Sequence, residues 1–282
     1  MARINEKTVS VNGLTVHYYE VGEKHNEHIL MLHGGFGSAW EQWREVLPLL
    51  AENHHVIAPD LPAYGQSDAL SGMTLQRLVD WALGLMDALG IQQAALVGNS
   101  FGGLIARILA AQQPERAEAL VLVNGGVIPS VPFLAKTIAS IPVLGNLVYK
   151  QVTRSTSSRT QLELAIKTQS VFTPEFLANV QANQKALAGL MRCLSITPVP
   201  PERVPKCPTL LLWGEEDAVT PRVVAEHIQR AIPDAKLSLI TEIGHMPQLE
   251  APEIFAGQIQ NFLRSAFRPK FPGGGRKTLG DN

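Results

Sequence analysis

Residues 94–111 read AALVGNSFGGLIARILAA, in which an apolar run passes into a glycine-rich turn and then into a helix-forming stretch. The turn, GNSFG at residues 98–102, matches the pattern G-x-S-x-G, which places a nucleophile between a strand and a helix. Larger side chains at its two glycines would collide across the turn, and the strained backbone would push Ser100 into a pocket. A serine that only caps the helix is the alternative. At residue frequencies near 7%, this pattern occurs by chance in roughly one chain of ten of this length. Whether Ser100 is a nucleophile therefore depends on the residues around the motif.

Composition and charge exclude several classes of protein. The 282 residues are 45% hydrophobic and 17% charged, with a formal net charge of -1, which suits one large globular domain or a domain with an insertion. The interspersed charges give no basic stripe for nucleic acid and no polybasic patch for a membrane, and no apolar run approaches the ~18 residues of a membrane span. The sequence therefore predicts a small-molecule partner, with no nucleic acid and no membrane, and leaves a homodimer open.

Targeting signals and cysteine spacing add two expectations. The first residues alternate apolar and polar side chains and lack the apolar core of a signal peptide, which predicts a cytoplasmic protein. Cys193 and Cys207 match no metal-ligand spacing and are expected to be reduced thiols. We expect neither a metal nor a cofactor.

Short apolar runs recur along the chain and predict the sheet. Continuous apolar runs, unlike alternating ones, are typical of strands buried on both faces of a parallel sheet. The segments between them carry apolar residues at helical spacing, as from Trp43 to Leu50. Repeated strand and helix predict an α/β fold with a mostly parallel sheet covered by helices, and Asn12-Gly13 predicts an antiparallel hairpin before it. The predicted parallel strands are Ile29–Leu32, Val56–Ala58, Ala94–Val97, Ala119–Val123, Thr209–Trp213 and Leu237–Ile240.

The strand pattern stops after residue 125 and resumes after residue 205. Helical and irregular stretches punctuated by prolines occupy residues 126–205 and predict a helical cap inserted between two parts of one core, residues 1–125 and 206–267. The insertion's prolines are Pro129, Pro132, Pro142, Pro198, Pro200 and Pro201. Residues 268–282 are rich in glycine, proline and lysine and predict a disordered tail.

A nucleophilic serine needs a base, and that base needs an acceptor that fixes its tautomer. His245 follows the last predicted strand, at the carboxyl edge of the sheet, where ligands of open α/β folds bind. Asp217 follows the preceding strand at the same edge; Glu215 and Glu216 come earlier in that turn and rank below it. The loop at residues 123–125 offers no carboxylate. The order serine, aspartate, histidine predicts a catalytic triad.

Acyl transfer also needs hydrogen-bond donors for the developing oxyanion. The backbone N–H of Phe101, next to the nucleophile, is one expected donor. The other is expected from the loop HGGFG at residues 33–37, where Gly35 is the first choice and Phe36 the second. His33 is expected to hold this loop.

The motifs HGGFG, DLPAYGQSD, GNSFGG, LLWGEEDAVTP and GHMPQLEAPE make residues 8–267 resemble the α/β-hydrolase superfamily. The resemblance implies the α/β-hydrolase fold; Ala63 stands where glycine is common in the family. Serine at position 100 argues against haloalkane dehalogenases and epoxide hydrolases, which use aspartate there. The turn is similar to that of hydrolases that cleave carbon–carbon bonds in aromatic ring-fission products. Departures are HGGFGS in place of their HGGGPG and Met246 in place of their tryptophan.

Substrate contacts are expected from the insertion. Its apolar residues, among them Phe133 and Leu144, are candidates to wall a pocket, although packing onto the core explains them as well. In the light of the resemblance, Arg192 is a candidate to bind a substrate carboxylate, or else a surface arginine, and Met246 is a further candidate for substrate binding.

We therefore expect a serine hydrolase that forms an acyl-enzyme with a small, largely apolar carbonyl substrate. The bond cleaved is a carboxylic ester or an activated carbon–carbon bond of a diketone. The alternatives are a lyase or cofactor-free oxygenase with the same serine, histidine and aspartate, or a ligand receptor without catalysis.

Overall fold

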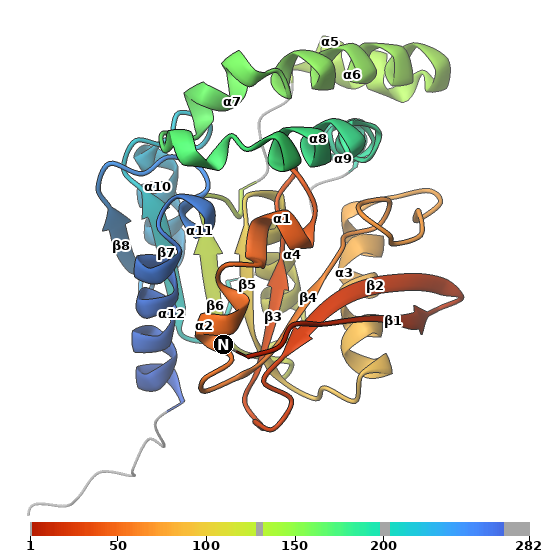
Figure 1. Ribbon diagram of the computed structural model, residues 1–282. Coiled ribbons are helices and arrows are strands. Elements are labelled where there is room, and N and C mark those ends of the chain that lie inside the picture. The colour runs from red at the N-terminus through yellow and green to blue at the C-terminus, as the bar shows by residue number, and fades with distance from the viewer. Residues whose placement is uncertain (1, 128–131, 198–203, 268–282) are drawn as a thin grey trace, which may run out of the picture.

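The computed structural model describes residues 2–127, 132–197 and 204–267. The predicted tail at residues 268–282, Pro129 and the prolines at 198, 200 and 201 lie outside the described residues. Within them, eight strands form one sheet in the order β1-β2-β4-β3-β5-β6-β7-β8 (Figure 1). The strands are β1 (Asn5–Val11), β2 (Leu14–Val21), β3 (His28–Leu32), β4 (His55–Pro59), β5 (Ala94–Asn99), β6 (Ala117–Val123), β7 (Thr209–Gly214) and β8 (Lys236–Ile240).

The strand pairings confirm the predicted α/β fold. β1 pairs with β2, and β2 with β4, in antiparallel fashion, and all other neighbours from β4 to β8 are parallel. The hairpin turns at Asn12 and Gly13, which both have positive φ, as the Asn-Gly pair predicts. All six residues of β5 are buried, because helices cover both faces of the central strands.

Two hydrophobic cores lie on opposite faces of this sheet. Neighbouring residues of a strand alternate between them, so that Leu96 belongs to one core and Val97 to the other. Helices α3 (Leu75–Ala88), α4 (Phe101–Gln112) and α10 (Arg222–Ala231) cover the first face. Helices α1 (Ala39–Trp43), α2 (Leu47–Leu50) and α12 (Pro252–Ala266) cover the second.

The apolar spacing from Trp43 to Leu50 indicated one helical segment, whereas the structure has two short helices, α1 and α2. Pro48 lies in the first turn of α2. A proline there cannot donate to the carbonyl four residues earlier, so one continuous helix would lose a hydrogen bond and meet a steric clash. Both Trp43 and Leu50 are nevertheless fully buried.

Between β6 and β7, the residues that the structure describes form five α-helices and one short 3-10 helix, and we call residues 132–197 the helical insertion. Its elements are α5 (Phe133–Ser140), α6 (Pro142–Thr156), α7 (Arg159–Ala165), η1 (Gln169–Val171), α8 (Pro174–Ala182) and α9 (Gln184–Ile196). They lie over the end of the sheet at which β3, β5 and β6 terminate, with α5 and α6 farthest from it (Figure 1). The described residues include no helix that is both long and apolar enough to cross a membrane.

Candidate active site

Ser100 lies between β5 and α4 in a strained conformation, with φ of 50° and ψ of -110°. Its backbone N–H donates to the Val123 carbonyl oxygen at 2.8 Å. The turn is so tight that a Cβ at Gly98 would lie 2.4 Å from the Gly102 carbonyl carbon, and one at Gly102 would lie 2.1 Å from the Leu32 carbonyl oxygen. Only glycine fits at both positions, and this geometry is typical of a turn that exposes a nucleophile.

His245 and Asp217 form a buried pair at the same edge of the sheet. Nδ1 of His245 lies 2.8 Å from Oδ2 of Asp217. The other oxygen, Oδ1, accepts hydrogen bonds from the backbone N–H groups of Val219 at 2.7 Å and Thr220 at 3.0 Å. Oδ2 also accepts from Nδ2 of Asn124 and from the Thr220 hydroxyl, each at 2.6 Å. The carboxylate is therefore held in one orientation.

The same hydrogen bonds decide the charge of Asp217. Burial alone would raise the pKa of its carboxyl group, but the hydrogen bonds from His245, Thr220 and Asn124, with the attraction of His245, lower the pKa below its ordinary value. The carboxylate is then ionised at neutral pH and accepts a hydrogen bond from the N–H at Nδ1 of His245. Nε2 of His245 remains as the nitrogen available to act as a base.

Asn99 ties the turn around Ser100 to the loop that carries His245. Its side-chain Nδ2 donates to the His245 carbonyl oxygen at 3.2 Å and to the Val123 carbonyl oxygen at 3.2 Å. The backbone N–H of His245 donates in turn to the Ala165 carbonyl oxygen of the helical insertion at 2.7 Å. The two loops are thus fixed relative to each other by buried hydrogen bonds.

The glycine-rich loop after β3 lies beside the nucleophile. A Cβ at Gly34 would lie 3.2 Å from the Ser100 Cβ. The N–H of Gly34 is already used, because it donates to Oε1 of Gln42 at 2.9 Å, while Nε2 of Gln42 donates to the Phe36 carbonyl oxygen at 2.8 Å. In the described part of the chain, the N–H groups of Gly35, Phe36 and Phe101 donate to no protein group. These three are the donors available for an oxyanion.

His33 has a structural environment, as the sequence predicted. Its Nδ1 pairs with the Gly34 carbonyl oxygen at 2.7 Å, and its Nε2 accepts from the Leu61 N–H at 2.9 Å. Burial lowers the pKa of His33, so the ring is neutral and joins the two loops.

Glu250 is a part of the site that sequence reasoning missed. It lies in α11 (Pro247–Glu250) and is buried. Its Oε1 accepts from the N–H groups of Gly244 at 3.1 Å and Met246 at 3.2 Å, on either side of the histidine. Its Oε2 accepts from the N–H groups of Lys167 at 2.7 Å and Thr168 at 3.1 Å in the helical insertion. This side chain therefore holds the histidine loop against the insertion.

The predicted substrate-binding residues fall in different environments. Met246 is buried in a cluster with apolar residues of the helical insertion, such as Phe176. Nε of Arg192 donates to the Ala139 carbonyl oxygen at 2.8 Å, so part of its guanidinium is used within the insertion. Phe133 and Leu144 are 84% and 44% exposed.

Leu187 was not singled out in the sequence but lies over the oxyanion loop. A Cβ at Gly35 would approach its Cδ1 to 2.7 Å. A leucine on a helical insertion gives no sequence signal for such a position. Leu187 in α9 is therefore an apolar wall candidate beside the site.

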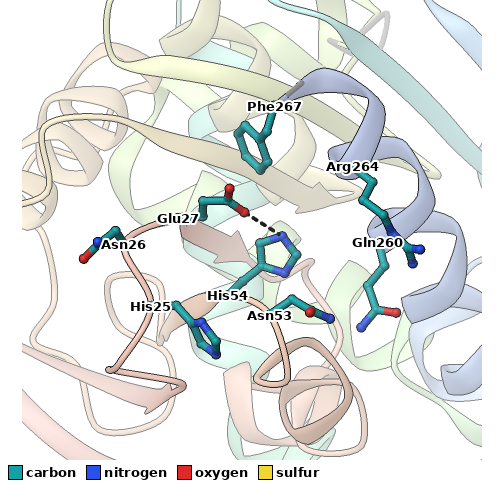
Figure 2. A pocket seen from close by; sticks show the side chains of 8 residues that line it. All are labelled: His25, Asn26, Glu27, Asn53, His54, Gln260, Arg264 and Phe267. Carbon is teal, nitrogen blue, oxygen red and sulfur yellow. Dashed lines mark ion pairs between the residues drawn. The ribbon is translucent and has the colours of Figure 1, made fainter. Parts of the chain in front are cut away.

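A cavity of about 760 Å³ lies at the opposite edge of the sheet (Figure 2). It is lined in part by Glu27, which precedes β3, by His54, which precedes β4, and by Arg264 of α12. Nε2 of His54 lies 3.5 Å from Oε2 of Glu27. Because the amino ends of parallel strands face away from the usual ligand edge, this cavity is not the site of the triad candidates. Nowhere in residues 2–127, 132–197 and 204–267 do three His, Cys, Asp or Glu side chains gather to hold a metal ion.

Comparisons with known proteins point to one family. A family model described as the alpha/beta hydrolase family matches residues 29–258. The chain is 32% identical to a 2-hydroxy-6-oxo-6-phenylhexa-2,4-dienoate hydrolase of Burkholderia cepacia, over 92% of this chain and 94% of that protein. The fold of this chain is similar to that of a thermophilic esterase from Thermogutta terrifontis, with a TM-score of 0.73 and 23% identity, over 93% of this chain and 99% of that protein. A meta-cleavage product hydrolase from Pseudomonas fluorescens IP01 gives a TM-score of 0.73 at 24% identity, covering 92% and 98%.

Proposed function

Because the chain belongs to the alpha/beta hydrolase family, we propose that it is a serine hydrolase with Ser100 as nucleophile, His245 as base and Asp217 as the residue that orients the base. The observation that carries the proposal is the buried 2.8 Å pair of His245 and Asp217, at the edge of the sheet where Ser100 occupies its strained turn. Its substrate is a small, largely apolar carbonyl compound.

In the proposed mechanism, Nε2 of His245 takes the hydroxyl proton of Ser100 while the serine oxygen attacks the carbonyl carbon. The N–H groups of Phe101 and of Gly35 or Phe36 stabilise the oxyanion that forms. The protonated histidine then gives its proton to the leaving group, which departs and leaves an acyl-enzyme. Water activated by His245 attacks the acyl carbon, and the acid is released with Ser100 restored.

A carboxylic ester is the first candidate substrate, because the proposed triad and oxyanion donors are sufficient for ester hydrolysis. A second candidate is the activated carbon–carbon bond of a vinylogous diketone. It is favoured by the name of the Burkholderia cepacia relative, a 2-hydroxy-6-oxo-6-phenylhexa-2,4-dienoate hydrolase. Against it, Arg192, the candidate for a substrate carboxylate, already donates from Nε to Ala139.

The decisive experiment compares the wild type with Ser100→Ala on p-nitrophenyl esters of increasing acyl length and on 2-hydroxy-6-oxo-6-phenylhexa-2,4-dienoate. We expect ester turnover in the wild type and a loss of several orders of magnitude in the variant. Ser140→Ala, at an exposed serine of α5, is the matched control and should keep full activity. Activity on the diketone alone would select the second candidate.

A fluorophosphonate label tests the remaining alternatives. Rapid labelling that is lost in Ser100→Ala supports an activated nucleophile, whereas absent labelling would favour a ligand receptor. Labelling does not separate the hydrolase from a lyase or an oxygenase that uses the same serine, but turnover that persists in Ser100→Ala would refute the acyl-enzyme.

Three sequence-based predictions stay proposals. Residues 126–205 would act as a cap over the site, and the burial of Met246 and the position of Leu187 support a pocket wall there. The exposure of Phe133 and Leu144 gives them no such support. A cytoplasmic location and a homodimer are the other two.

A further inference from the structure

Exposed apolar side chains gather on the two outermost helices of the insertion. Of the twelve large apolar side chains that are exposed among the described residues, six lie in the fifteen-residue stretch from Phe133 to Leu147, in and between α5 and α6. Phe133 is 84% exposed, and Val143 is 74% exposed. We call this surface the outer face; its apolar residues are Phe133, Leu134, Ile141, Val143, Leu144 and Leu147. A patch of this kind is uncommon on a monomer unless something binds to it.

The outer face is not needed to hold α5 and α6 in place, because their other side packs on α9. The buried hydroxyl of Tyr149 on α6 hydrogen-bonds the buried hydroxyl of Ser195 on α9. Nε of Arg192 on α9 donates to the Ala139 carbonyl oxygen of α5 at 2.8 Å. In Figure 1, α8 and α9 lie between these helices and the sheet, so α5 and α6 are the outermost helices of the insertion.

The charge of this region is entirely positive. Residues 119–162 contain no aspartate or glutamate, although the chain has 25 acidic residues. Lys136, Lys150 and Arg154 are exposed, and in the part of the chain that the structure describes they form no ion pair. Val143, Leu147, Lys150 and Arg154 are spaced by four, three and four residues, so they follow one side of α6.

We propose that the outer face binds the surface of an anionic lipid bilayer. Helices with exposed apolar residues and neighbouring basic residues lie in the plane of a membrane interface, where apolar side chains enter the acyl boundary and lysine and arginine meet the phosphates. A second copy of the chain is a poorer occupant, because two such faces would bring six unpaired positive charges together.

This inference concerns one surface, whereas the expectation of no membrane partner was drawn from the whole chain. The net charge of -1 conceals the patch because all acidic residues lie outside residues 119–162. The inference does not depend on the proposed triad.

Vesicle flotation of the full chain tests it, with phosphatidylcholine vesicles and with vesicles that also contain phosphatidylglycerol. We expect binding to the anionic vesicles, weakened by salt, and little binding to the neutral ones. Each basic residue near an anionic surface is worth about five-fold in partitioning, so the triple variant K136Q/K150Q/R154Q should lose about 100-fold. The apolar double variant V143S/L147S should lose at least about ten-fold.

The matched control is V223S/I254S, which removes two apolar side chains, also more than half exposed, from α10 and α12. It should bind like the wild type. Turnover of a water-soluble ester and the thermal melting curve check that every variant is folded. If V143S/L147S unfolds, the vesicle binding of K136Q/K150Q/R154Q alone tests the proposal. Equal binding to both vesicle types, or no loss in the variants, overturns the proposal. A wild-type dimer that V143S/L147S converts to monomer, without lipid binding, would assign the face to a second copy.

Discussion

The carboxyl edge of the sheet and the outer face of the helical insertion are built in opposite ways. At the edge, the carboxylate of Asp217 accepts hydrogen bonds from four residues and is held in one orientation. On the outer face, apolar side chains are exposed, and three basic side chains form no ion pair among the described residues. The residues at the edge are held in place by hydrogen bonds to one another, so their function is inferred from contacts within the protein. The residues of the outer face do not pack in the core, so their function is inferred from the kind of partner that could bind them.

The largest effect should come from breaking the constraint at the edge with Asp217→Asn. An amide cannot hold His245 in the required tautomer, and its NH₂ group would face the donors Asn124 and Thr220. We expect turnover to fall by about 10⁴-fold while substrate binding changes little. Steady-state kinetics on the best ester substrate measure this. Glu216→Gln, an exposed neighbour in the same turn, should be unchanged; a comparable loss there would move the acid to Glu216.

Residues 94–111 and the acid and histidine after the last two strands could be predicted because each follows from a local rule. A buried strand is continuous in apolar residues, and a tight turn demands glycine. The comparisons confirm the α/β-hydrolase resemblance and the enzyme drawn from these motifs. The roles of the individual residues rest on the geometry and stay predictions.

Asn124 and Glu250 could not be predicted in the same way. Asn124 follows β6 in a loop that lacks the carboxylate expected of a triad acid, and its side-chain amide instead donates to Asp217. Glu250 accepts from backbone N–H groups of the nearby histidine loop and of Lys167, 83 positions earlier in the sequence, and only the folded chain brings these two segments together. The predicted substrate residues rest on a weaker signal: apolar spacing on α5 does not say which side of the helix faces inward, and of that helix only Ala139 is buried.

A matched pair of glycine substitutions sharpens the comparison between the two regions. In Gly102→Ala the new Cβ would lie 2.1 Å from the backbone oxygen of Leu32, so the turn must distort, and we expect a loss of about 3 kcal/mol in unfolding free energy. In Gly189→Ala, in the middle of α9, nothing lies within 4 Å, and we expect a gain of about 0.5–1 kcal/mol. Urea denaturation measures both. If Gly102→Ala unfolded like the wild type, the tightness of the nucleophile turn would be refuted.

Asn124→Ala should have an intermediate effect, because it removes one buried donor from Asp217. We expect a loss of about 1–3 kcal/mol in stability. The lost hydrogen bond also raises the pKa of Asp217 toward its ordinary value.

The sign of the pH dependence follows from that shift. In the wild type the lowered pKa of Asp217 contributes stability above the ordinary aspartate pKa near 3.9, and this contribution is lost as the pH falls through the native value. The variant should therefore lose less stability than the wild type between neutral pH and about pH 3. Unfolding free energies at several pH values measure the difference, and identical pH profiles would contradict the role assigned to Asn124.

The smallest effect should come from Leu134→Ser on the outer face. Leu134 is 71% exposed, so the substitution removes little buried area and leaves no cavity; we expect the unfolding free energy to change by less than about 0.5 kcal/mol. Leu190→Ala, at a buried leucine of α9 in the same insertion, is the contrasting variant and should cost about 2–5 kcal/mol. Chemical denaturation of both variants separates the two sides of the insertion. A loss of several kcal/mol in Leu134→Ser would mean that the outer face is covered within the molecule, and its apolar residues would then need no partner outside the chain.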